Sequence, residues 1–328
     1  MSETQSSYPF ASARVKALEP KLITKEKLNR LTESRDFETA MRHLNEFGYG
    51  QSAGDFEAMI QKELEETDAL LVALSPSDVF THIVRAQRDY YNLKVIIKLL
   101  MRDLAIDSVP LVSGNISVET LRRAISENNY YELPDNMTDA LRYIDKQFAV
   151  ATDPSVIGVA LDRAYAKEIR DLVAQMKNEL ITKYFTVFFD LCNIIALLRV
   201  RAAGDTKDTF DRAFLKGGSI DKRTLLDAFD VPNESVLSVA GRGGYAAILA
   251  DAFEDYIKTG SLYMLEKKRD DYLLSLLREQ RHDMFGIGPL FGYYIAKQRE
   301  AEAVRMVMTA KQGGIDADVV AKRLKELY

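Results

Sequence analysis

A short motif recurs four times along this chain, and its spacing constrains the fold more than any single residue does. Each copy has an isoleucine, a hydroxyl or acidic residue, three further positions and then an apolar residue. The copies are Ile23-Thr24 to Leu28, Ile116-Ser117 to Leu121, Ile220-Asp221 to Leu225 and Ile315-Asp316 to Val320. They are separated by 93, 104 and 95 residues. A period of about 100 residues indicates stacked or ring-arranged units of one design rather than one domain built around one active site.

The second residue of each copy has the chemistry of a helix N-cap, because its side-chain oxygen can accept a backbone N–H of the first helical turn. These residues are Thr24, Ser117, Asp221 and Asp316. Glycines precede the later three copies, and we expect them to close a preceding helix in the left-handed conformation. They are Gly114, Gly217-Gly218 and Gly313-Gly314. The motif therefore predicts a loop, a cap and an amphipathic helix, with no functional site in it.

Between the copies, apolar residues return every three or four positions, which is typical of helices. The clearest runs are 79–100, 161–180 and 261–277. Few prolines, no tryptophan and abundant Ala, Leu, Glu, Lys and Arg also favour helix over strand. We predict an all-α fold with a disordered N-terminus at 1–7 and helical repeats at 8–112, 113–216 and 217–328.

Charge and apolar content exclude several classes of protein. A net charge of -5 argues against a nucleic-acid binder, which usually carries a basic excess. The single cysteine, Cys192, excludes an internal disulfide framework and fits a reducing compartment. The first residues lack the apolar core of a signal peptide, and the most apolar stretch, 184–198, is shorter than the about 20 residues that cross a membrane. We expect a soluble, intracellular chain.

Catalytic motifs are not apparent in the sequence. His43, His82 and His282 are far apart and have no metal-ligand spacing. The glycine-rich stretch 241–245 is not followed by the Lys-Ser/Thr pair of a phosphate loop, and no strand precedes it. Cys192 lies in the most apolar helix, where a thiol is usually an inert core residue. We expect no catalytic residue, cofactor, metal or small-molecule substrate.

Acid–amide pairs on the apolar helices are the most informative polar feature. Asp89 precedes Asn92 by three residues, and Asp190 precedes Asn193 by the same step. Glu300 holds the matching place in the third repeat, where Ala303 replaces the amide. The spacing puts both side chains on one helix face, where the amide can donate to the carboxylate. Such pairs could serve acid–base or metal chemistry. We favour a polar pair that organises a helix junction or lines a central cavity, because buried polar groups need partners.

Several short stretches carry a resemblance to a known family, in order and with matching spacing along nearly the whole chain. They are Ser12 to Lys16, Leu22 to Thr24, Asp89 to Lys94, Asn193 to Arg199, Gly217 to Ile220, Gly292 to Lys297, Glu300 and Arg305. At these residues the chain resembles the C subunit of the archaeal and bacterial A/V-type ATPases, the counterpart of the d subunit of the eukaryotic vacuolar enzyme. The family usually has asparagine where this chain has Ser12 and Ala303.

The resemblance implies a three-lobed, pseudo-threefold helical funnel with no catalytic activity of its own. Such a central-stalk subunit lies on the cytoplasmic face of the membrane proteolipid ring and receives the foot of the D- and F-type shaft subunits. It thereby couples the rotor shaft to proton or sodium transport. For this chain we expect a polar, partner-binding lumen lined by Asp89, Asn92, Asp190, Asn193, Glu300 and Arg305. The alternatives are a helical-repeat adaptor that binds helical peptides, and an all-α metalloenzyme that uses Asp89, Asp190 and Glu300.

Overall fold

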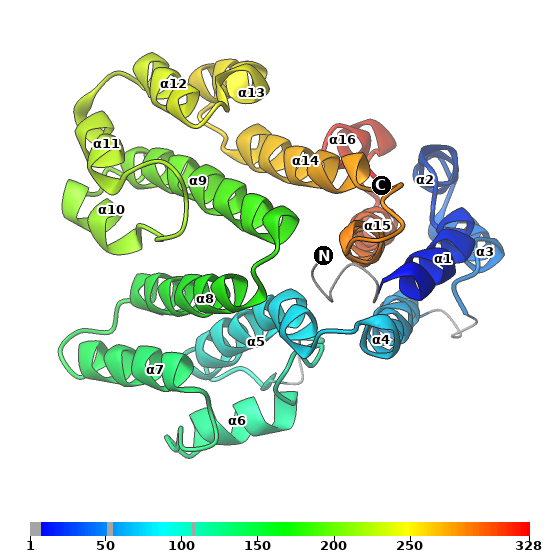
Figure 1. The fold of residues 1–328 in the computed structure, drawn as a ribbon, viewed down its shortest axis with the longest axis horizontal. Helices are drawn as coiled ribbons and strands as arrows, with labels where there is room; N and C mark the ends of the chain where they lie inside the picture. Colours follow the sequence, from blue (N-terminus) through cyan, green and yellow to red (C-terminus); the bar gives the residue numbers. More distant parts are fainter. Residues whose placement is uncertain (1–7, 51–54, 107–108) are drawn as a thin grey trace. The chain divides into compact units, whose positions relative to one another are not determined.

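The computed structural model describes residues 8–50, 55–106 and 109–328, and the regular structure in these ranges is entirely helical (Figure 1). The all-α prediction is therefore confirmed for this part of the chain. The predicted disordered segment 1–7 lies outside the described residues. The first helices are α1 (Pro9–Leu18), the 3-10 turn η2 (Glu19–Lys21), α2 (Lys25–Thr32), α3 (Phe37–Glu46), α4 (Phe56–Leu74) and α5 (Asp78–Leu100). The middle helices are α6 (Val118–Ser126), α7 (Asp135–Phe148), α8 (Ser155–Met176), α9 (Glu179–Ala202), α10 (Lys207–Ala213) and α11 (Lys222–Asp227). The last are η4 (Ala228–Asp230), α12 (Asn233–Arg242), α13 (Ala246–Thr259), α14 (Tyr263–Glu279), α15 (Gly288–Gln312) and α16 (Ala317–Ala321).

The chain divides into two compact units. Unit 1 comprises Met1–Asp78 and Asp270–Tyr328, and unit 2 comprises Val79–Arg269. Unit 1 thus joins the first helices of the sequence to the last ones. The three-repeat division at 8–112, 113–216 and 217–328 stays a prediction.

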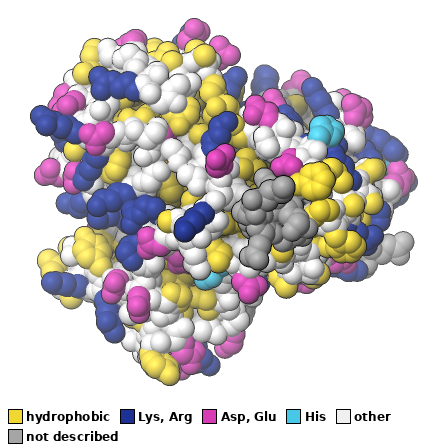
Figure 2. Space-filling view, in the orientation of Figure 1, with side chains coloured by type: hydrophobic (Ala, Val, Ile, Leu, Met, Phe, Trp, Pro, Cys, Tyr) yellow, Lys and Arg dark blue, Asp and Glu magenta, His cyan; other side chains and the backbone are white. Residues whose placement is uncertain are grey.

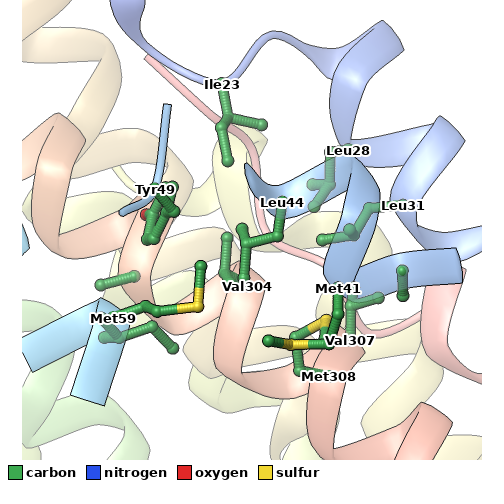
Figure 3. Packing of buried hydrophobic residues seen from close by; sticks show 14 of the residues in the cluster. Ile23, Leu28, Leu31, Met41, Leu44, Tyr49, Met59, Val304, Val307 and Met308 are labelled. Carbon is green, nitrogen blue, oxygen red and sulfur yellow. The ribbon is translucent and has the colours of Figure 1, made fainter. Parts of the chain in front are cut away.

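Unit 1 is built around α15, a helix of 25 residues that contacts α1, α2, α3, α4 and α16. Its apolar residues Val304, Val307 and Met308 are at most 1% exposed. Figure 3 shows these side chains packed with Leu28 and Leu31 of α2 and with others from α3 and α4. Burial of this apolar surface is the main favourable contribution to the folding of unit 1.

Unit 2 contains the most apolar helix of the chain, α9. Tyr184 and Phe185 of α9 are buried there, and Tyr90 of α5 packs edge-on against Tyr165 of α8, with ring centroids 5.6 Å apart. The helix has 24 residues, so it is longer than the apolar run seen in the sequence. By length and composition alone it could cross a membrane, with a mean hydropathy of 1.6 over its best window. However, 61% of that window is buried within the protein, as in a core helix.

Charged side chains of both signs lie on one face of the molecule. Figure 2 shows Lys and Arg side chains interspersed with Asp and Glu over the visible face, with small hydrophobic areas between them. A mixed surface of this kind agrees with the modest net charge of -5.

Three of the four predicted N-caps are confirmed. Thr24 accepts the N–H of Lys27 at 3.3 Å, Ser117 accepts that of Thr120 at 3.1 Å, and Asp316 accepts that of Asp318 at 3.1 Å. The prediction is wrong for Asp221, which stands at the N-cap of α11 but makes no capping hydrogen bond. The turn before α11 is instead held by a carboxylate from another helix, as described below.

We predict that truncating Leu44 weakens unit 1, because its side chain is fully buried among α2, α3 and α15. Leu44→Ala should lower the free energy of unfolding by ~2–5 kcal/mol in urea titrations, from lost burial and the cavity left behind. Val72→Ala, on α4 of the same unit, is the control because Val72 is 55% exposed. It should change stability by no more than about 0.5 kcal/mol. Equal effects of the two substitutions would contradict this packing.

Candidate functional site

Three of the long helices carry a buried carboxylate whose oxygens accept backbone N–H groups of a distant turn. The residues are Asp89 on α5, Asp190 on α9 and Glu300 on α15, and each is at most 2% exposed. In each case the turn contains the isoleucine of one copy of the recurring motif. We call each set of hydrogen bonds a carboxylate–turn junction.

The two aspartates bind their turns in the same way. Asp89 accepts the N–H of Asn115 at 2.9 Å on one oxygen and that of Ile116 at 3.1 Å on the other. Asp190 accepts the N–H of Ser219 at 3.0 Å and that of Ile220 at 2.8 Å. Each carboxylate therefore accepts hydrogen bonds from two successive backbone amides of the turn that precedes a helix, and the charge of the carboxylate strengthens them.

Asp190 has further donors. The hydroxyl of Ser219 donates to its Oδ2 at 2.6 Å, and the hydroxyl of Tyr245 donates to the same oxygen at 2.9 Å. These contacts tie α9 to the turn before α11 and to the residue before α13. This carboxylate therefore connects three segments of unit 2, which are α9, the turn before α11 and the start of α13.

Glu300 makes the third junction with a turn that is far away in sequence. Its Oε2 accepts the N–H of Ile23 at 2.6 Å, across 277 residues. Its Oε1 accepts hydrogen bonds from the Tyr49 hydroxyl at 2.9 Å and the Lys297 ammonium at 2.7 Å. The first copy of the motif, rather than the fourth, is thus joined to α15. Ile315 of the fourth copy instead donates its N–H to the carbonyl of Ala310 at 2.8 Å.

Two of the glycines ahead of the motif are needed for space. A Cβ on Gly114 would lie 2.2 Å from an Asp89 oxygen, and one on Gly218 would lie 2.1 Å from an Asp190 oxygen. Neither glycine has a positive φ, so the predicted left-handed helix end is wrong for them. It is confirmed for Gly314, with φ of 65°, while Gly217 adopts a φ of 124°.

The first copy has Lys21 in the position of these glycines. Its carboxylate comes from a glutamate, which is one methylene longer than an aspartate. Glu300 can therefore reach the turn from farther away, so the close approach that requires glycine is not needed there. The type of acid and the presence of glycine vary together across the three junctions.

The two amides bind backbone as well. Asn92 donates to the carbonyl of Val112 at 3.0 Å. Asn193 donates to the carbonyl of Leu215 at 2.8 Å and accepts the N–H of the same residue at 2.8 Å. The expected bond from amide to carboxylate within each pair is wrong, because both groups are used by the connecting segment. On α15, Ala303 has no amide and packs in the apolar core of unit 1.

Arg305 lies apart from the junctions. Its guanidinium forms an ion pair with Glu57 of α4, with the shortest nitrogen–oxygen distance at 2.5 Å, and its side chain is 41% exposed. The contact joins α15 to α4 within unit 1. The roles of Arg305 and of the five buried residues in binding a partner stay a prediction.

Two tyrosines that complete the junctions were not expected from the sequence. Tyr49 lies 26 residues after Ile23, and Tyr245 lies 25 residues after Ile220. Each donates its hydroxyl to the carboxylate that holds that isoleucine. The matching place after Ile116 is Leu141, a buried apolar side chain. The recurrence of tyrosine at this distance was the available signal.

Asp89 therefore has fewer hydrogen-bond donors around its carboxylate than Asp190 or Glu300 has. Burial raises the pKa of its carboxyl to about 6, and the backbone N–H groups of Asn115 and Ile116 offset this only in part. The charge of buried Glu168 raises it further. Glu168 itself accepts hydrogen bonds from His82 at 2.8 Å and Tyr90 at 2.6 Å. The hydrogen bond to Glu168 raises the pKa of His82.

Glu300 differs because it has a cation beside it. Burial alone would lower the pKa of Lys297, but Glu300 and Glu63 stabilise its ammonium and raise that pKa overall. The Lys297 nitrogen lies 2.8 Å from Glu63 and 5.5 Å from the centre of the Tyr49 ring. Among the described residues, no group of three or more His, Cys, Asp or Glu is placed to hold a metal. The junctions bind backbone, so their chemistry is that of fixing turns to helices.

The fold and these junctions define an all-helical protein whose connecting turns are held by buried carboxylates of its long helices. Its sequence matches the ATP synthase (C/AC39) subunit family over residues 11–323, and the chain belongs to this family. The C subunit of the V-type sodium ATPase of Enterococcus hirae is 26% identical, over 84% of this chain and 83% of the relative. The C subunit of the A-type ATP synthase of Methanocaldococcus jannaschii is also 26% identical, over 93% and 82%. That of Thermococcus kodakarensis is 22% identical, over 98% and 91%.

We predict that a methyl group at position 218 breaks the Asp190 junction. Gly218→Ala should lower the free energy of unfolding by about 2 kcal/mol or more, because hydrogen bonds to a buried carboxylate are lost. Urea titration measures the change. Gly158→Ala is the matched control, since Gly158 lies within α8 and an added Cβ meets nothing within 4 Å. The control should be neutral or stabilising by up to about 1 kcal/mol. A harmless Gly218→Ala would refute the junction.

We predict that Asp89 makes the protein less stable as pH rises from about 4 to about 6. Its folded-state pKa of about 6 exceeds the unfolded value of about 3.9, so the folded state binds the proton more tightly in this window. Asparagine does not titrate, so Asp89→Asn removes this pH-dependent loss of stability, which is on the order of 2 kcal/mol. The substitution should therefore reduce stability least near pH 7. The measurement is urea titration of both proteins across this range.

Asp251→Asn is the control for removing one negative charge, because the side chain of Asp251 is 85% exposed. The difference in stability between wild type and Asp89→Asn should change with pH, whereas that between wild type and the control should stay nearly constant. A constant difference for Asp89→Asn would contradict the shifted pKa.

Proposed function

We propose that this chain is a non-catalytic central-stalk subunit of a rotary A/V-type ATPase or ATP synthase. In this role it joins the D- and F-type shaft subunits to the proteolipid ring on the cytoplasmic face of the membrane, and it transmits rotation for proton or sodium transport. Family membership and the names of the relatives, a sodium ATPase and ATP synthases, support the assignment to such a complex.

One structural observation carries the mechanical part of the proposal, namely the repeated carboxylate–turn junction. A subunit that transmits torque must resist twisting, and loops between helices are its most compliant parts. In this chain three such turns are held by charge-assisted hydrogen bonds to buried carboxylates. Close packing around them adds resistance to deformation. These are the properties that a rigid socket requires.

The proposal includes three similar lobes, at 8–112, 113–216 and 217–328, arranged as a pseudo-threefold funnel. In it, Asp89, Asn92, Asp190, Asn193 and Glu300 act on the shaft subunits through the turns that they hold. Since these five side chains are buried, the turns rather than the carboxylates would meet the partner. Arg305, which is partly exposed, is the one member of the set that could contact the partner directly.

We predict that the chain co-purifies with shaft and ring subunits from detergent-solubilised membranes. Membranes depleted of it should still hydrolyse ATP but should pump few ions per ATP, and adding back the wild-type protein should restore pumping. Ion pumping is followed with a fluorescent indicator beside a coupled assay of ATP hydrolysis. Normal coupling in depleted membranes would contradict the proposed role.

The junctions can be tested in the same system. Gly218→Ala should bind the purified shaft subunits at least several-fold more weakly than the wild type, because the turn at 219–220 is no longer held. Gly158→Ala should bind them normally. Binding is titrated under conditions where circular dichroism shows both variants to be folded. Unchanged affinity of the folded Gly218→Ala protein would remove the junction from partner binding while leaving the stalk role intact.

A further inference from the structure

The carboxylate–turn junction at Asp89 is built differently from the other two. Within the described residues, Asp89 accepts two hydrogen bonds, one on each oxygen, and both come from backbone amides. Asp190 accepts four, two of them from hydroxyls, and Glu300 accepts three, one of them from an ammonium. The Asp89 carboxylate therefore relies on two amides, although its side chain is buried like the others.

A second buried carboxylate acts on Asp89. Glu168 of α8 is 7% exposed, and its negative charge adds to the burial that raises the pKa of Asp89. Glu168 accepts hydrogen bonds from the Tyr90 hydroxyl and from the His82 ring, both on α5. Two buried carboxylates that act on each other resist being ionised together, because like charges repel strongly where water is excluded. Proton uptake at this cluster relieves that repulsion.

Basic side chains of α5 and α6 surround this cluster without pairing with Asp89. The hydrogen bond to Glu168 is the main cause that raises the pKa of His82, and the charges of Glu168 and Asp89 add to it. The arginines of α5, Arg85 and Arg88, have interactions of their own, and so has Arg122 of α6. Within the described part of the chain, none of the principal influences on the Asp89 carboxyl is a cation. Its charge therefore depends on the two amides of the turn.

The turn at 115–116 is tied to α5 at three points. Asn115 donates its backbone N–H to one oxygen of Asp89 and its side-chain amide to the carbonyl of His82 at 3.0 Å. Ile116 donates its N–H to the other oxygen of Asp89. Because both oxygens accept, a proton on either one puts an O–H donor where an acceptor was needed. The amide bound to that oxygen then loses its charged acceptor.

Proton uptake by Asp89 and detachment of the turn favour each other. The two backbone N–H groups lower the pKa of Asp89, so a buried carboxyl without them would bind its proton more tightly still. By linkage, a fall in pH shifts the turn toward the detached state. Global unfolding differs, because it exposes Asp89 to water and returns its pKa to the lower, unfolded value. Acid therefore stabilises the folded chain through Asp89 while it loosens this one turn.

We propose that Asp89 makes the turn at 115–116 a pH-sensitive switch within unit 2. Near neutral pH the ionised carboxylate holds both amides, and in mildly acidic solution the protonated carboxyl releases one of them. The turns at Ile220 and Ile23 stay in place, because their carboxylates also have hydroxyl or ammonium donors. The switch is a property of the chain itself and does not depend on the stalk role.

Hydrogen exchange of the full-length purified chain tests the switch. Protection factors correct for the pH dependence of exchange in an unstructured chain, and NMR measures them for individual amides. The measurements are made at about pH 7.5 and about pH 5, on either side of the Asp89 pKa of about 6. Protection of the Asn115 and Ile116 amides should fall about tenfold at the lower pH, as expected for one lost hydrogen bond. Protection of the Ser219 and Ile220 amides should not change.

Two variants identify the group that takes up the proton. Asp89→Asn cannot titrate, so protection of the turn should be low and equal at both pH values. Asp251→Asn, at an exposed position, is the control and should behave as the wild type does. His82→Gln keeps a donor for Glu168 but cannot become charged. In this variant the fall should persist and should occur at higher pH, because a cation that favours ionised Asp89 is gone. Circular dichroism should confirm that each variant is folded.

Three results would overturn the proposal. The first is wild-type protection at 115–116 that is the same at both pH values. The second is a fall in protection that Asp89→Asn leaves intact. The third is a fall that His82→Gln abolishes, because the histidine and not Asp89 would then be the group that responds to pH.

Discussion

The hydrogen bonds that backbone N–H groups of a turn donate to a buried carboxylate are the interaction on which the rest of this structure depends. Asp89, Asp190 and Glu300 each place charge in an interior where an unpaired ion would cost several kcal/mol. The turns supply the compensation, because their backbone N–H groups lie outside the hydrogen-bond ladder of any helix and need acceptors when buried. Each junction therefore gives hydrogen-bond partners both to the carboxylate and to the backbone amides. If either partner is removed, the other is left buried without a hydrogen bond, at the full cost of its desolvation.

The three junctions differ in ways that follow from simple chemistry. The aspartates approach closely and require glycine at 114 and 218, while the longer Glu300 binds a turn with Lys21 in that place. Glu300 has an ammonium beside it, Asp190 has a tyrosine and a serine hydroxyl, and Asp89 has only amides. Burial raises the pKa of Asp89 to about 6, because its backbone N–H donors offset the burial only in part.

Helix content, N-caps and the importance of the acid–amide pairs could be predicted from the sequence, because they depend on local spacing. Thr24 and Ser117 act as caps as expected, and Asp89 and Asp190 are buried polar centres. The partners of such centres could not be predicted, since the hydrogen bonds that Glu300 accepts from Ile23 and Tyr49 cross more than half the chain. The predicted left-handed conformation of Gly114 and Gly218 was wrong for the same reason. These positions need glycine because the side chains of Asp89 and Asp190, which are distant in sequence, approach them closely.

The central claim is that these carboxylates hold the turns, and hydrogen exchange of individual amides tests it most directly. In the wild type, the amides of Ser219 and Ile220 should exchange slowly although they precede a helix rather than lie within it. In Asp190→Asn, their exchange should accelerate at least tenfold, while the amides of Asn115, Ile116 and Ile23 keep their wild-type rates. Fast exchange at Ser219 and Ile220 in the wild type, or unchanged exchange in the variant, would contradict the claim.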